Sequence, residues 1–169
     1  YREAPMLAKL VESGALPPVA QRLPPEPMVV PVVERIGDYG GTWHEYISGP
    51  SEAYKLQRAG AYETLFRWNA DFTDVEPNIV EAVDVANDGR QYTFRLRKGI
   101  RWSDGAPFSA DDILFAINDV LGNKELSPGG LPSWLTMGGE APFVEKIDDY
   151  TIRFTFAEPQ GMFTQRLAD

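Results

Sequence analysis

The chain has 169 residues, a formal net charge of −9 at pH 7 and no cysteine. The length suffices for one domain with a hydrophobic core. The acidic balance argues against a nucleic-acid partner and against adhesion to an anionic membrane, because both need basic side chains. The lack of cysteine excludes disulfides and thiolate metal sites. No apolar run approaches the roughly 20 residues of a transmembrane helix.

Residues 1–40 form an N-terminal extension in which prolines interrupt regular structure. Residues 3–13 predict a short helix that ends at Gly14. Two proline pairs then stiffen the chain, and residues 29–36 predict a strand before a glycine-rich turn. The extension either packs against the body of the protein or forms a partly ordered tail.

Residues 42–75 predict a strand, a loop, a helix and a hairpin in that order. Residues 42–47 alternate side chains between two faces and predict the first core strand. A helix is predicted over residues 53–66, with Gly60 as its weak point. A short hairpin follows over residues 67–75.

The stretch from residue 82 to residue 97 predicts a β-hairpin. Residues 91–97 alternate apolar and polar side chains, which is the period of a strand buried on one face. Asn87, Asp88 and Gly89 tolerate the positive φ of a hairpin turn. Residues 82–86 should therefore pair with the strand that follows.

A second turn at residues 103–105 leads into a capped helix. Ser109 is the predicted N-cap, and Asp112, three residues on, completes an imperfect capping box because Asp is shorter than the usual Glu. The helix carries an apolar stripe on one side. Phe115 lies on the opposite, polar side, which suggests that something else covers it. Gly122 ends the helix.

The last 47 residues predict a loop, a second hairpin and a final helix. Residues 123–142 are rich in glycine and proline and carry one short apolar piece. Residues 144–156 predict a hairpin with its turn at Asp148 and Asp149, and residues 160–169 begin a helix. Trp134, in the loop, either covers the local core or contacts a ligand.

The side chains that carry chemistry form no catalytic set. His44 is the only histidine, so a triad or zinc site lacks partners, and we expect a hydrogen-bonded residue of the core or the surface. Asp111 and Asp112 belong to a helix N-terminus and Asp148 and Asp149 to a turn, which explains these carboxylates without catalysis. We expect Trp102 to fill a corner between strand and turn. No metal or cofactor site is predicted.

Several motifs occur in a fixed order along the chain. They are YETLF at residues 62–66, PNIVEA at 77–82, YTFRLRKG at 92–99, WSDG at 102–105, PFSADD at 107–112, VEKIDDYTIRF at 144–154 and EP at 158–159. This series resembles the family 5 extracytoplasmic solute-binding proteins, the oligopeptide- and dipeptide-binding proteins of bacterial ABC importers. The resemblance covers roughly residue 41 to the C-terminus.

The resemblance implies a mixed α+β fold of the class II periplasmic-binding-protein type, present only in part. Residues 1–40 would be the extension, residues 41–60 the first strand and loop of lobe I, and residues 61–169 a small inserted α+β subdomain that is cut short. We expect the chain to be the N-terminal fragment of a larger protein, and a complete small domain is the alternative.

The implied function is solute binding for an ABC importer, without enzymatic activity or a cofactor. The resemblance implies an extracytoplasmic monomer that binds a small solute, a peptide by preference, and delivers it to a membrane permease. The same fold would also serve a sensor or a chaperone-type binding protein, and an acidic hydrolase is the remaining alternative. The expected ligand contacts are Ser48, Gly49, Pro50, Ser51, Glu52 and Trp134.

Overall fold

The computed structural model describes residues 1–60, 62–136 and 138–168, without the side chains of residues 56–59. The chain divides into two compact units, Tyr1–Glu63 and Thr64–Asp169. Helices and strands are both present, so the predicted mixed α+β class is confirmed. The finer division into an extension, a lobe and an inserted subdomain stays a prediction.

The unit Tyr1–Glu63 is helical where it is regular. It contains α1 (Ala8–Glu12), α2 (Val19–Arg22), the 3-10 turn η1 (Pro50–Glu52) and α3 (Ala53–Gly60). An ion pair of 2.6 Å between Arg22 Nη2 and Glu3 Oε2 ties the start of the chain to α2. The predicted end of the first helix is confirmed, because Gly14 adopts a φ of 74° just after α1.

The strands predicted at residues 29–36 and 42–47 are wrong, because both segments are irregular in the structure. A strand persists only when its N–H and C=O groups pair with a neighbouring strand. No described residue of Tyr1–Glu63 belongs to a strand. The apolar side chains of these segments consequently lie in solvent, with Trp43 77% and Tyr46 94% exposed.

The helix predicted over residues 53–66 ends earlier, at Gly60. Glycine has the lowest helix propensity after proline, so the helix ends at the residue that favours a helix least. Phe66 instead begins β1 and is only 2% exposed. Burial of this ring in the second unit outweighs the local helical pattern.

The unit Thr64–Asp169 is built on a four-stranded antiparallel sheet. Its strands are β3 (Val80–Ala86), β4 (Gln91–Leu96), β5 (Phe143–Asp148) and β6 (Thr151–Thr155), in the spatial order β3-β4-β6-β5. A separate two-stranded ribbon pairs β1 (Phe66–Trp68) with β2 (Val75–Pro77). The three hairpins predicted from the sequence are therefore confirmed.

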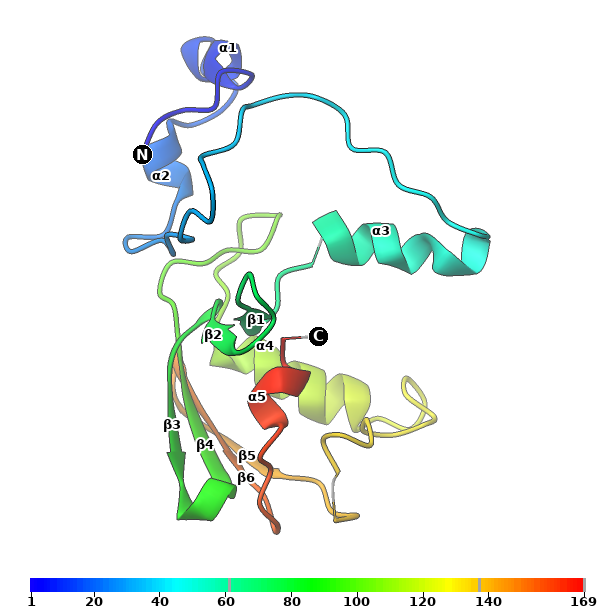
Figure 1. The fold of residues 1–169 in the computed structure, drawn as a ribbon. Helices are drawn as coiled ribbons and strands as arrows, with labels where there is room; N and C mark the ends of the chain where they lie inside the picture. The colour runs from blue at the N-terminus through cyan, green and yellow to red at the C-terminus, as the bar shows by residue number, and fades with distance from the viewer. Residues whose placement is uncertain (61, 137, 169) are drawn as a thin grey trace. The chain divides into compact units, whose positions relative to one another are not determined.

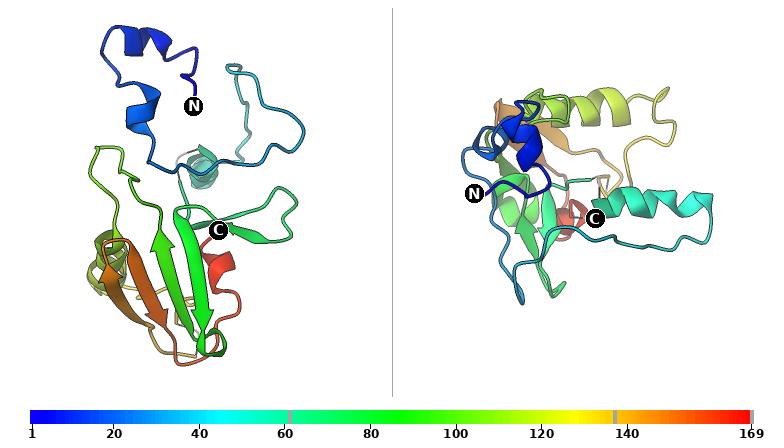
Figure 2. Two further views of the ribbon diagram at one scale, coloured as in Figure 1. Left: turned by 90° about the vertical axis from the view of Figure 1, so that its left-hand side faces the viewer. Right: turned by 90° about the horizontal axis from the view of Figure 1, so that it is seen from above.

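One face of the four-stranded sheet carries the core. Figure 1 shows the sheet nearly edge-on with α4 (Ala110–Phe115) and α5 (Phe163–Arg166) on the same side of it, and Figure 2 gives the view onto the other face. Every second side chain of β4 and β6 points into this layer. The buried apolar residues are Phe66, Val80, Tyr92, Phe94, Leu96, Ala110, Leu135, Ile152, Phe154, Phe156 and Phe163.

Phe163 is the centre of this core. Its ring lies 4.8 Å from Phe156, 5.1 Å from Tyr92 and 5.2 Å from Phe154, each in an edge-to-face arrangement. Such contacts add to the free energy gained by removing the rings from water. Phe163 is the one fully buried residue of the short helix α5. The predicted last helix is confirmed but shorter, and Asp169 lies outside the described residues.

Turn chemistry sets the register of the central hairpin. The 3-10 turn η2 (Asn87–Gly89) joins β3 to β4, and Asn87 and Asp88 both have a φ of 53°. Asparagine and aspartate accept this left-handed conformation more readily than other residues. The Tyr92 hydroxyl donates a 2.6 Å hydrogen bond to the Gln160 carbonyl and so fixes the segment after β6 against the hairpin.

The capped helix continues beyond α4 as a π-helical stretch, η3 (Ala116–Leu121). Its predicted apolar side, including Ile113, Leu114 and Ile117, packs against the core. Phe115 is 60% exposed, as its place on the polar side predicts. A Cβ on Gly122 would lie 2.6 Å from the Asn118 carbonyl oxygen, so glycine is required where the helix ends.

Candidate functional site

The predicted ligand loop forms the start of a helix. Pro50–Glu52 is the turn η1, and α3 continues directly from it. The Glu52 carboxylate accepts a 2.8 Å hydrogen bond from the Ser48 backbone N–H through Oε2, and Oε1 pairs with Lys55 Nζ at 2.6 Å. Glu52 therefore closes the loop on itself in the manner of a capping residue.

The contacts of Glu52 change its acidity. The hydrogen bond from Lys55, followed by that from the Ser48 amide, lowers the pKa of the Glu52 carboxyl below its usual value. The carboxylate thus stays ionised, but both of its oxygens already accept hydrogen bonds from groups of the loop and of α3. The part of Ser48, Gly49, Pro50, Ser51 and Glu52 in ligand binding stays a prediction.

Trp134 lies in the second unit and packs against the core. Its side chain is partly buried, and its ring centre lies 6.4 Å from that of Phe163. This places Trp134 over the local core, which is one of the two roles the sequence allows. The expected ligand residues thus lie in separate units, and the contact of Trp134 with a ligand also stays a prediction.

The motif around Ser109 builds the capped N-terminus of α4. The Ser109 backbone N–H donates a 2.7 Å hydrogen bond to Asp112 Oδ2, and the Asp111 N–H donates to Ser109 Oγ at 3.3 Å. The capping box predicted from the sequence is confirmed. These bonds satisfy backbone groups that have no partner within the helix.

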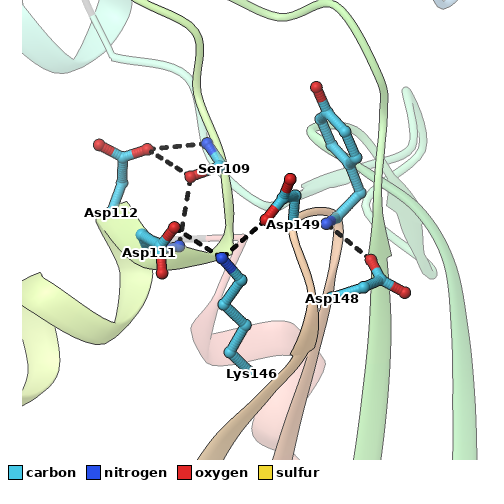
Figure 3. A network of polar contacts seen from close by, with 7 residues as sticks. Ser109, Asp111, Asp112, Lys146, Asp148 and Asp149 are labelled. Carbon is cyan, nitrogen blue, oxygen red and sulfur yellow. Dashed lines mark hydrogen bonds and ion pairs between the residues drawn. The ribbon is translucent and has the colours of Figure 1, made fainter.

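Lys146 joins this cap to the second hairpin (Figure 3). Its Nζ lies 2.7 Å from Asp111 Oδ2 and 2.7 Å from Asp149 Oδ1. The two hydrogen bonds raise the pKa of the Lys146 ammonium above its usual range. Sequence reasoning missed this link because Lys146 and Asp111 are 35 residues apart and no local pattern connects them. The network joins the start of α4 to the β5–β6 hairpin. The two Asp pairs, at residues 111–112 and 148–149, therefore have the cap and turn roles expected from the sequence.

Trp102 occupies the predicted corner. Its ring lies 5.4 Å from Phe108 edge-to-face, and its Nε1–H donates a 3.1 Å hydrogen bond to Asp112 Oδ1. Half of the side chain is exposed. The WSDG motif therefore braces the turn at Gly105, whose φ is 92°, against the cap of α4.

Metal-ligating side chains do not cluster in the described part of the chain. No three of the described His, Asp or Glu side chains converge as metal ligands. His44 is exposed within an irregular segment. Across the described ranges, no helix has the length and apolar character needed to traverse a bilayer.

One exposed aromatic escaped sequence reasoning altogether. Phe72, at the tip of the β1–β2 hairpin, is 75% exposed and has a φ of 55°. The sequence signal was a large aromatic residue inside a predicted turn, where small and polar residues are usual.

Comparison with known proteins places these motifs in a family. The family model described as "Bacterial extracellular solute-binding proteins, family 5 Middle" matches residues 74–169. The match contains the central hairpin, the capped helix and the second hairpin.

Three similar proteins extend the comparison. The periplasmic alpha-galactoside-binding protein of Rhizobium meliloti (strain 1021) is 36% identical over 94% of this chain and 26% of its own length. Di/tripeptide-binding protein 1 of Pseudomonas aeruginosa (strain UCBPP-PA14) is 34% identical over 64% of this chain and 23% of its own. The solved structure of an oligopeptide-binding protein OppA is 43% identical over 99% of this chain and 26% of its own, with a TM-score of 0.86.

Two facts follow from these comparisons. The likeness to OppA confirms the predicted binding-protein fold, of which this chain holds a part. The chain spans about a quarter of the length of the relatives it matches.

Proposed function

Because the chain belongs to family 5 of the bacterial extracellular solute-binding proteins, we propose that its protein is the solute-binding component of an ABC importer. The proposed solute is a peptide, which the protein delivers to a membrane permease from the outer side of the cytoplasmic membrane. The protein acts as a monomer and performs no chemistry on the solute.

The observation that carries the peptide proposal is the likeness to OppA. It extends over 99% of the chain at 43% identity, with a TM-score of 0.86. The di/tripeptide-binding relative supports the same solute class over a shorter range. An extended peptide could be held by main-chain groups of the loop at residues 48–52, since main-chain hydrogen bonds give affinity without reading every side chain.

An α-galactoside is the second candidate solute. The alpha-galactoside-binding relative matches 94% of this chain, including most of the unit Tyr1–Glu63, whereas the di/tripeptide-binding relative matches 64%. The length of this match supports an α-galactoside as the alternative to the peptide proposed first. Trp134 would suit either ligand, because an aromatic face packs against apolar surfaces of many kinds.

The test is calorimetric titration of the full-length protein with a pool of short peptides and, separately, with raffinose as an α-galactoside. A ligand that binds only the folded state also stabilises it by about 2.7 kcal/mol at 100 times Kd. Saturable peptide binding supports the first proposal, and saturable raffinose binding alone supports the second. Binding of neither would overturn both solute proposals.

Two substitutions test the proposed contacts. Glu52→Ala removes the carboxylate that closes the loop, and Trp134→Phe keeps a ring over the core while shortening its reach. Each should weaken solute binding, whereas Phe143→Thr, at an exposed position of β5, should leave it unchanged. Unchanged affinity in both test variants would remove these residues from the site.

Enzymatic activity remains the least supported alternative. An acidic hydrolase would need a base or nucleophile, and His44 is the only histidine of the chain. Assays of His44→Ala on generic esterase and glycosidase substrates would expose such an activity as a loss of turnover.

A further inference from the structure

We draw no further inference here: the strongest candidate, the exposed apolar surface of the irregular segment at residues 29–47 in the unit Tyr1–Glu63, which includes Val33, Trp43 and Tyr46, carries none because nothing in the structure shows what covers it.

Discussion

The two units of this chain differ in how much of their apolar side chains is exposed to solvent. Every fully buried apolar side chain identified in the structure belongs to Thr64–Asp169. In Tyr1–Glu63 none of the described side chains is fully buried, and large apolar residues such as Trp43 and Tyr46 are mostly exposed. Burial of apolar surface is the main favourable term in folding. The comparison shows that apolar side chains stabilise regular structure only where another layer of the protein covers them.

Hydrogen exchange should show the largest difference between the units. Backbone amides of β4 and β6, paired on both sides, should exchange only through global unfolding, at a free energy of roughly 5–15 kcal/mol. Amides of residues 29–47 should exchange with almost no protection. Mass spectrometry of exchanged peptides would measure this, and strong protection within residues 29–47 would break the comparison.

Removing the central aromatic of the core should have the next largest effect. Phe163→Ala leaves a cavity among Tyr92, Phe154 and Phe156 and should lower the free energy of unfolding by about 3–5 kcal/mol. Urea denaturation followed by fluorescence would measure it. The control is Trp43→Ser in the first unit, which should change stability by about 0.5 kcal/mol or less because this ring is exposed. Similar losses in the two variants would contradict the contrast between the units.

Loss of the helix cap should have a smaller effect. Ser109→Ala removes the hydroxyl that accepts from the Asp111 N–H and should cost about 1 kcal/mol. Ser109→Thr keeps the hydroxyl and should retain most of the stability. Thermal unfolding of both variants would distinguish them, and equal losses would mean that the cap contributes through packing.

The β5–β6 turn should make stability depend on pH in the acid range. The hydrogen bond from the Tyr150 backbone N–H, then that from the Thr151 side chain, lowers the pKa of Asp148 below its ordinary value. A lowered folded-state pKa means that the carboxylate stabilises the fold above about pH 4 and that this contribution is lost as the pH falls through the folded-state pKa.

Asp148→Asn tests this dependence directly. The amide oxygen can still accept from Tyr150 but does not titrate, so the variant should be less stable than the parent near neutral pH and should lose less stability as the pH falls below about 4. Denaturant titrations at several pH values would show it. Parallel pH profiles for the parent and the variant would contradict the assignment.

Local patterns in the sequence determined most of the second unit. Period-two alternation predicted β4 and β6, and Asn87, Asp88 and Gly89 predicted the turn that sets the register of β3 against β4. Ser109 and Asp112 predicted the helix start. These turns and caps depend only on neighbours within a few residues. They are therefore determined by the backbone conformations that each residue type allows.

Only the tertiary structure decided the rest. Residues 42–47 have the alternation of a strand, but no described residue of their own unit forms a strand with which they could pair, and Phe66 leaves a helical pattern because its ring is buried. The bond of Lys146 to Asp111 spans 35 residues of chain, and the display of Phe72 depends on how Asn69 folds the tip. Each outcome depends on which segments meet in space, because pairing, burial and charge contacts between distant segments leave no local pattern in a single sequence.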